Sequence, residues 1–168
     1  MKTKLTAILS SVFIGLFALT FTGTAEATEP KGIESKEAYE MVMASPADTF
    51  IVDVRTVAEY IFVGHPDLPN GVANIPLKFF PSWETNREFV PQVAARYKKS
   101  DTLIIICRSG GRAKAAATVL NIAGFDRTLY MTDSFEGALD EAGHRTVSGW
   151  KVNDLPYTYE LKEELLYR

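Results

Sequence analysis

An uninterrupted apolar run, Thr102–Ile106, constrains the fold of this chain more than any other segment. Consecutive β-branched and aliphatic residues without polar alternation are typical of a strand that is covered on both faces. Such strands occur in parallel sheets that carry helices on each side. An alanine-rich segment, Arg112–Ile122, follows and has the composition of a helix that ends before Gly124. The sequence therefore predicts a buried strand, a short loop and a helix in that order.

Strand and helix patterns alternate along the remainder of the chain. Helical patterns begin at Ser35, which we expect to cap its helix, and extend over Val57–Ile61 and Phe89–Tyr97. Strand patterns cover Phe50–Val54, Val72–Ile75 and Thr128–Met131, whereas the prolines and the Asn-Gly pair of residues 64–71 predict an irregular loop. We therefore predict an α/β fold with a mostly parallel central sheet and helices on both faces. Ligands of such folds bind beyond the carboxyl ends of the strands.

The amino-terminal segment departs from the globular pattern. Two lysines precede an apolar run, Leu5–Phe21, and an Ala-Glu-Ala sequence ends at Ala27. This layout is typical of a secretory signal peptide. The alternative is a retained membrane anchor, but polar residues interrupt the run, which barely reaches spanning length. We expect a signal peptide at 1–27, a single domain at 28–168, and a periplasmic or secreted mature protein without stable membrane association.

Charge and cysteine content restrict the classes of function. The chain has 18 basic and 21 acidic residues and a net charge of -3, which gives no general attraction for nucleic acid or anionic lipid. Its single cysteine, Cys107, excludes an internal disulfide and is either a buried apolar residue or a working thiol. One cysteine and two histidines form no metal-ligand cluster, and no nucleotide-binding fingerprint occurs. We therefore expect neither a metal nor a cofactor.

Six residues between the buried strand and the following helix carry the chemical signal. These residues are Cys107, Arg108, Ser109, Gly110, Gly111 and Arg112. The two glycines let the loop curl so that backbone amides converge on the sulfur, and the two arginines add positive charge. Taken singly, each feature fits a core residue, a turn or a solvated charge. Together, at the start of a helix, they predict a nest that stabilises a reactive thiolate and binds a small anion.

This loop and the Ala-Lys-Ala-Ala sequence after it resemble the active site of the rhodanese family. Other pieces agree with the family pattern in order and approximate spacing: Asp53-Val54-Arg55, Glu59-Tyr60, Gly64-His65 and Asn74-Ile75-Pro76. The resemblance covers most of residues 33–156. It implies a rhodanese-like α/β domain with a central five-stranded sheet. It also implies that Cys107 is the catalytic residue and carries sulfur as a persulfide.

The resemblance also implies a reaction. Four residues intervene between Cys107 and Arg112, which is the loop length of sulfurtransferases, whereas related phosphatases and arsenate reductases have a longer loop. We expect transfer of a sulfane sulfur from thiosulfate or a similar anionic donor to cyanide, a thiol or a protein acceptor. Residues 108–112 are the predicted substrate-binding residues. Two alternatives stay open: an oxyanion reductase or phosphatase that uses the same loop, and a sulfur-carrier module without turnover.

Charged residues outside the loop are assigned to structural support. Asp53, Arg55 and Glu59 are expected to form an ion-pair network that braces the first strand-to-helix connection, because such networks are common without catalysis. His65, in a proline-rich loop, is expected to orient backbone. The second histidine, His144, is expected to be exposed.

The rim of the site departs from the family pattern. Residues 66–71 lengthen one connection, and residues 132–137 stand where the family commonly has paired glycines. Residues 140–148 are either an inserted loop that shapes access to Cys107 or an insertion at the surface without a role in access. The sequence does not distinguish these two alternatives. Phe79, Phe80 and Trp83 form an aromatic stretch for which core packing is favoured over a partner surface.

Overall fold

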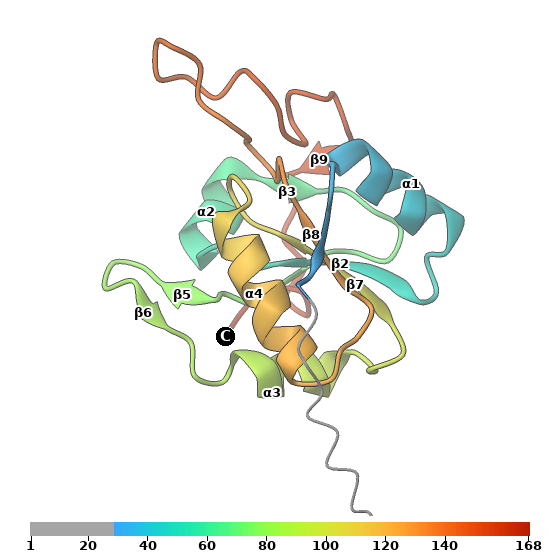
Figure 1. Ribbon diagram of the computed structural model, residues 1–168. Helices are drawn as coiled ribbons and strands as arrows, with labels where there is room; N and C mark the ends of the chain where they lie inside the picture. The colour runs from blue at the N-terminus through green and yellow to red at the C-terminus, as the bar shows by residue number, and fades with distance from the viewer. Residues whose placement is uncertain (1–28) are drawn as a thin grey trace, which may run out of the picture.

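A five-stranded parallel sheet lies at the centre of the computed structural model, which describes residues 29–168 (Figure 1). In the order in which they lie side by side, its strands are β1 (Lys31–Ile33), β8 (Thr128–Met131), β7 (Thr102–Ile106), β2 (Thr49–Asp53) and β4 (Ala73–Asn74). Every pair of neighbours runs parallel. The middle strand, β7, is buried along its whole length. The predicted α/β architecture is confirmed.

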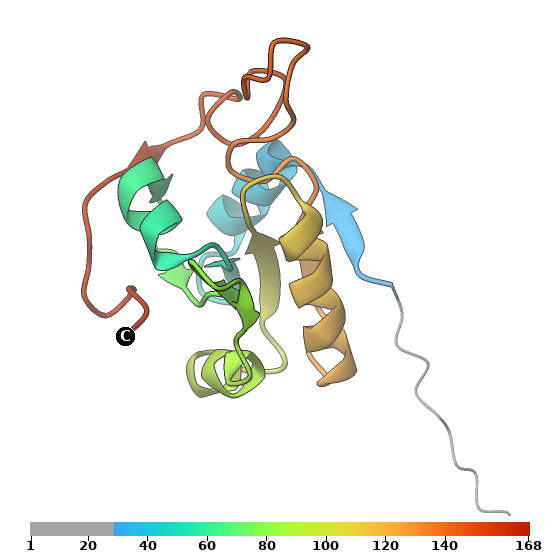
Figure 2. The same cartoon turned by 90° about the vertical axis from the view of Figure 1, so that its left-hand side faces the viewer.

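Helices cover both faces of the sheet. The helices within residues 29–168 are α1 (Ser35–Ala44), α2 (Val57–Val63), α3 (Phe89–Arg96) and α4 (Gly111–Ile122). One core joins apolar residues of α3 and α4 to Leu103 and Ile105, and the other joins α1 to Ile104 and Ile106. Successive side chains of a strand point to opposite faces, so the single run in β7 contributes to both cores. Figure 2 shows α1 and α4 on different sides of the sheet.

The short helix α2 begins with a capping box. The Thr56 hydroxyl accepts a hydrogen bond from the Glu59 amide, and the Glu59 carboxylate accepts one from the Thr56 amide. This reciprocal pair satisfies two amides that have no partner within the helix. Tyr60 is the buried residue of α2, and its hydroxyl donates to the Val72 carbonyl at 2.8 Å. One side of α2 is thus fixed to the domain, and the other side is left at the surface.

Two small antiparallel pairs were not predicted. β3 (His65–Pro66) pairs with β9 (Tyr157–Thr158), and β5 (Lys78–Phe79) pairs with β6 (Glu84–Thr85). The prediction of an irregular loop over 64–71 is therefore wrong for His65 and Pro66. Their strand partner lies far along the chain, so no local pattern indicates the pairing.

The expected cap at Ser35 is also wrong. Ser35 is the first residue of α1, and the residue before it, Glu34, makes no side-chain cap. The Ser35 hydroxyl instead donates to the Asp133 carboxylate at 2.6 Å. That contact ties the start of α1 to the segment that follows β8.

The carboxyl-terminal residues cover the β4 edge of the sheet. The backbone amide of Asn74 donates to the Leu165 carbonyl at 2.8 Å, and the Arg96 side chain donates to the Glu164 carbonyl. The rings of Tyr167 and Phe79 lie 5.5 Å apart between centroids. A covered edge cannot add a further strand from another chain.

The predicted signal peptide at 1–27 lies outside the described residues. Among residues 29–168, no helix combines the length and the apolar character that a membrane crossing requires.

Candidate active site

Cys107 lies directly after β7, at the carboxyl edge of the parallel sheet. Its side chain is 1% exposed. Its carbonyl accepts a hydrogen bond from the Phe135 amide at 3.0 Å, which fixes the backbone of the loop. Helix α4 begins at Gly111, so residues 107–110 bring the sulfur to the amino-terminal end of α4. This is the edge at which open α/β sheets bind their ligands.

The sulfur of Cys107 receives a backbone hydrogen bond. The Gly110 amide donates to Sγ at 3.1 Å. Gly110 is also the N-cap of α4, and it provides no side-chain cap. The first amides of a helix have no partner within the helix, and they carry a partial positive charge. A thiolate at Sγ is therefore stabilised.

The two glycines of the loop have different roles. Gly110 has φ 97°, and a Cβ on it would collide with the Thr132 carbonyl oxygen. A larger residue would therefore be strained by both conformation and contact. A Cβ on Gly111 would meet nothing within 4 Å. The conformation and the close contact at Gly110 therefore require glycine, whereas no contact excludes a side chain at Gly111.

Ser134 is a site residue that sequence reasoning missed. Its hydroxyl oxygen lies 3.6 Å from Sγ and accepts a hydrogen bond from the Cys107 amide at 3.2 Å. The hydroxyl donates to the Met131 carbonyl at 2.8 Å. Ser134 is fully buried with φ 53°, a left-handed conformation that glycine adopts easily. The one available signal was its position in a segment where the family commonly has glycines.

Arg112 is held by an acidic partner. Its two terminal nitrogens donate to the two carboxylate oxygens of Glu59 at 2.7 Å each, and both side chains are 17% exposed. Burial alone would raise the pKa of Glu59, but hydrogen bonds from Arg112 and Thr56 lower it to about 2. Burial lowers the pKa of Arg112, and the Glu59 carboxylate more than offsets this, so the net shift is upward. The pair joins α2 to α4.

Arg108 and Ser109 lie at the open side of the loop. Both residues are exposed. Because Arg112 is paired with Glu59, Arg108 is the loop arginine whose charge faces solvent. The structure therefore distinguishes the two predicted substrate-binding arginines by their surroundings.

Asp53 and Arg55 form a buried pair behind the loop. The Arg55 guanidinium donates to the Asp53 carboxylate at 2.6 Å and to the Gly64 carbonyl at 2.7 Å, and neither side chain is exposed. It also stacks over the Phe135 ring, 4.3 Å from the centroid. These contacts are those of a bracing pair. Glu59, which was expected in the same network, pairs with Arg112 instead.

The two histidines occupy different environments. His65 is buried, stacks on Tyr60 with ring centroids 4.0 Å apart, and places Nε2 3.1 Å from the Glu160 carbonyl oxygen. Burial lowers the pKa of His65. His144 has a side chain that is 74% exposed. Over the described part of the chain, no group of three or more His, Cys, Asp or Glu side chains could hold a metal ion.

The loop of residues 138–148 begins at the active-site loop. The amides of Glu136 and Gly137 donate to the Arg108 carbonyl at 2.9 and 3.1 Å. The Arg145 side chain donates to the Gly137 carbonyl, and the Asp140 carboxylate accepts the His144 amide at 2.8 Å. Figure 1 shows this loop extending from the end of the molecule at which α4 begins. Its base is therefore part of the rim of the site.

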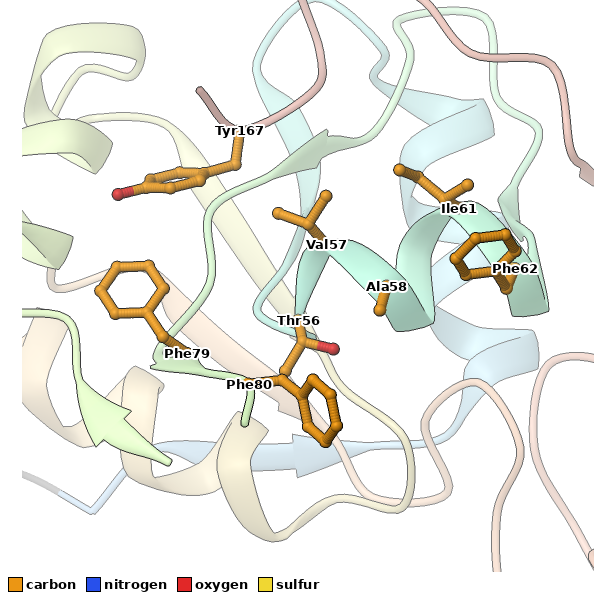
Figure 3. Close-up of a pocket in the computed structure, with 8 residues that line it drawn as sticks. All are labelled: Thr56, Val57, Ala58, Ile61, Phe62, Phe79, Phe80 and Tyr167. Atoms are coloured by element: carbon orange, nitrogen blue, oxygen red, sulfur yellow. The ribbon is translucent and has the colours of Figure 1, made fainter. Parts of the chain in front are cut away.

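The aromatic stretch near residue 80 is exposed in part. Phe80 is 65% exposed and Trp83 is 49% exposed, so the favoured prediction of core packing is wrong for both. Phe79 is partly buried, and Figure 3 shows its ring and that of Tyr167 on the same side of Val57. Apolar composition alone does not distinguish a core residue from a surface one.

Comparisons with known proteins agree with this architecture. The family model of the rhodanese-like domain matches residues 34–141. An uncharacterized protein of Rickettsia conorii is 33% identical over 131 residues, which is 77% of this chain and 98% of the relative. Thiosulfate sulfurtransferase 16, a chloroplastic protein of Arabidopsis thaliana, is 30% identical over 133 residues, or 78% of this chain and 95% of the relative. The crystal structure of Rv0390 from M. tuberculosis has a TM-score of 0.72 and 33% identity, and the match covers 79% of this chain and 100% of that one.

Proposed function

The chain belongs to the rhodanese-like domain family, and from this premise we propose that it is a sulfurtransferase whose Cys107 carries sulfur as a persulfide. The observation that carries the proposal is the hydrogen bond from the Gly110 amide to Sγ at 3.1 Å. At the amino-terminal end of α4, this donor stabilises the Cys107 thiolate, both when it attacks the donor and when it is regenerated by the acceptor.

In the first step, the Cys107 thiolate attacks the outer sulfur of thiosulfate. A new S–S bond forms at Cys107, the S–S bond of thiosulfate breaks, and sulfite leaves with the bonding electron pair. The negative charge of the thiolate passes to the terminal sulfur of the persulfide. Arg108, which is exposed beside Cys107, would stabilise the charge on the departing sulfite.

In the second step, an acceptor takes the terminal sulfur. Cyanide or a thiolate attacks that sulfur, the S–S bond to Cys107 breaks, and the Cys107 thiolate is regenerated. Thiocyanate or a new persulfide leaves. Because the enzyme is modified between the two substrates, ping-pong kinetics are expected.

The environment of Arg112 favours sulfur over phosphorus as the atom attacked. A phosphoryl or arsenyl group carries its charge on several equatorial oxygens and needs an arginine free to bind them in pairs. Both terminal nitrogens of Arg112 donate to Glu59 at 2.7 Å. Binding an oxyanion there would break this bidentate pair.

Steady-state kinetics test the proposal. With thiosulfate varied at several fixed concentrations of cyanide, double-reciprocal plots should give parallel lines. Cys107→Ser should abolish turnover, since a serine hydroxyl is not ionised near neutral pH, and Thr118→Ser on the outer part of α4 should retain it. Hydrolysis of an aryl phosphate, or reduction of arsenate, at a higher kcat/KM than thiosulfate turnover would overturn the proposal. Sulfur loading without turnover would leave the carrier alternative.

We also propose that the mature protein is exported. The proposal rests on the two lysines, the apolar run and the Ala-Glu-Ala sequence at the amino terminus. Disulfides form readily outside the cytoplasm, but a chain with a single cysteine cannot lose that cysteine to an internal disulfide.

A further inference from the structure

The hydroxyl of Ser134 lies beside the sulfur that reacts. Its oxygen is 3.6 Å from Sγ of Cys107, and either atom can be the donor in that contact. The same oxygen accepts the backbone amide of Cys107 at 3.2 Å, and the hydroxyl donates to the Met131 carbonyl at 2.8 Å. Ser134 is 0% exposed, so these bonds form away from bulk water. One hydroxyl therefore joins the sulfur, the backbone of the nucleophile and strand β8.

Ser134 holds this position in an unfavourable backbone conformation. Its φ is 53°, in the left-handed region that favours glycine. Neighbouring bonds keep it there: the Ser134 carbonyl accepts the Trp150 amide at 2.8 Å, and the Asp133 carboxylate accepts the amide and the hydroxyl of Ser35 at 2.9 and 2.6 Å. A strained residue beside an active site indicates that its side chain has a function. The group that glycine would lack here is the hydroxyl.

The bonding capacity of the hydroxyl is filled when Cys107 is a thiol. A serine hydroxyl has one proton to donate and two lone pairs that accept. The Met131 carbonyl takes the proton, and the Cys107 amide takes one lone pair. The second lone pair is left for the S–H group of Cys107, which fits the distance of 3.6 Å between Sγ and the Ser134 oxygen. In this state the hydroxyl accepts from the neutral thiol.

Ionisation of the thiol changes what the hydroxyl meets. A thiolate has no proton to donate, so a lone pair of the Ser134 oxygen would face a negative sulfur. Rotation about the bond between Cβ and Oγ turns the O–H group from the Met131 carbonyl to Sγ without moving a heavy atom. The exchange is favourable, because a hydrogen bond to an ionised partner is about twice as strong as one between neutral groups. The thiolate then has two donors, Ser134 and the Gly110 amide at 3.1 Å.

We propose that Ser134 is a second hydrogen-bond donor to the Cys107 sulfur, and that its hydroxyl turns from the Met131 carbonyl to Sγ whenever Sγ is anionic. The consequence for catalysis rests on the proposed function, and it adds a residue outside the loop to that site. Residues 132–137 stand where the rhodanese family commonly has paired glycines, which have no hydroxyl. The second donor is therefore a feature of this chain's own sequence.

The hydroxyl acts most directly when the persulfide is discharged. The acceptor forms a bond to the terminal sulfur, the S–S bond breaks, and the electron pair of that bond passes to Sγ of Cys107. The Ser134 hydroxyl turns to Sγ as this charge develops, and its proton stays on the serine oxygen throughout. A better stabilised thiolate is a better leaving group but a weaker nucleophile. Ser134 should therefore speed the discharge of the persulfide more than its formation.

Single-turnover discharge of the persulfide tests the proposal. Protein loaded with thiosulfate and freed of excess donor is mixed with cyanide, and loss of the added sulfur is followed by rapid quenching and mass spectrometry. Ser134→Gly, which suits a φ of 53° and removes the hydroxyl, should slow discharge about tenfold. Thr128→Val is the control and should leave the rate unchanged, because its buried hydroxyl donates to the Phe125 carbonyl at the other end of β8. Equal rates for the wild type and Ser134→Gly would overturn the proposal.

Alkylation of Cys107 by iodoacetamide tests the hydrogen bond without sulfur transfer, so it is informative even if no donor loads the protein. At pH 7 alkylation of Ser134→Gly should be about 3- to 10-fold slower than that of the wild type, because the reactive thiolate has lost a donor. The difference should disappear near pH 10, where the thiol is ionised in both proteins.

The substitution leaves every charged side chain around the loop in place, so the pH dependence reports on the hydroxyl. These side chains are Asp53, Arg55, Glu59, Arg108, Arg112 and Asp133. A loss of the same size at pH 7 and pH 10 would show that the hydroxyl only shapes the backbone of the loop, and the proposal would be wrong.

Discussion

Replacing Glu59 with Gln removes the charge partner of Arg112 while keeping a side chain that can serve in the capping box. Burial would raise the pKa of Glu59, but bonds from Arg112 and Thr56 lower it from an ordinary value of 4.5 to about 2. An acid whose pKa is lower in the folded protein stabilises the fold above its unfolded pKa, and this stability is lost as pH falls through the folded pKa. The lowering corresponds to about 3 kcal/mol at pH 7.

Urea unfolding of the wild type and Glu59→Gln at two pH values measures this contribution. The difference in free energy of unfolding should be about 3 kcal/mol at pH 7 and about 1.5 kcal/mol at pH 3, because part of the carboxylate advantage is lost between pH 4.5 and 2. The side chain is only 17% exposed, so solvent screens the pair weakly. Glu141→Gln, at an exposed position in the loop of residues 138–148, is the control and should change stability by less than about 0.5 kcal/mol at both pH values.

A difference that is the same at pH 3 and pH 7 would refute the reasoning, because it would show that the charge of Glu59 is not what stabilises the fold. A difference below about 0.5 kcal/mol at pH 7 would place the pair among weak surface salt bridges. Combining Glu59→Gln with Arg112→Gln should cost less than the sum of the single changes, since each single change leaves one partner unpaired.

Three further outcomes are expected. Gly110→Ala should lower the free energy of unfolding by more than about 1 kcal/mol and reduce sulfur transfer, because Gly110 has a φ of 97° and a Cβ on it would collide with the Thr132 carbonyl oxygen. Gly111→Ala should change the free energy of unfolding by less than about 1 kcal/mol. Equal effects of the two substitutions in urea unfolding would contradict this prediction. Ser134→Ala should destabilise the fold by about 1–3 kcal/mol, because the Cys107 amide loses its acceptor, and an unchanged unfolding midpoint would argue against that contact. Protein recovered from expressing cells should begin near Thr28 in amino-terminal sequencing, and an intact Met1 in the membrane fraction would support a retained anchor.

The centre of the fold could be predicted because its signals are local. The apolar run of β7 and the alanines of α4 are continuous in sequence, so the strand, the loop and the helix follow from composition and order. Cys107 could be identified because the chain has one cysteine and it lies between these two segments. The fifth strand of the sheet came from the family resemblance, since β1 has only three residues and no distinctive pattern.

The surroundings of Cys107 depend on contacts between distant segments. Ser134 is 27 residues from Cys107, and Glu59 is 53 residues from Arg112. Only the folded sheet brings these pairs together. The sequence of the loop therefore does not indicate that Arg112 is paired with Glu59 while Arg108 is exposed. The exposed rings of Phe80 and Trp83 were missed for a related reason, because hydrophobicity does not indicate whether a side chain has a core to enter.

Mass spectrometry of the intact protein after brief incubation with thiosulfate tests the central claim most directly. The account predicts the addition of one sulfur atom, located in the peptide that contains Cys107, absent from Cys107→Ser and removed by cyanide. Aryl phosphate and arsenate should give no adduct. If thiosulfate and other sulfane-sulfur donors all leave Cys107 unmodified while its thiol is reduced and reacts with a small alkylating agent, the protein is not a sulfurtransferase of the kind proposed.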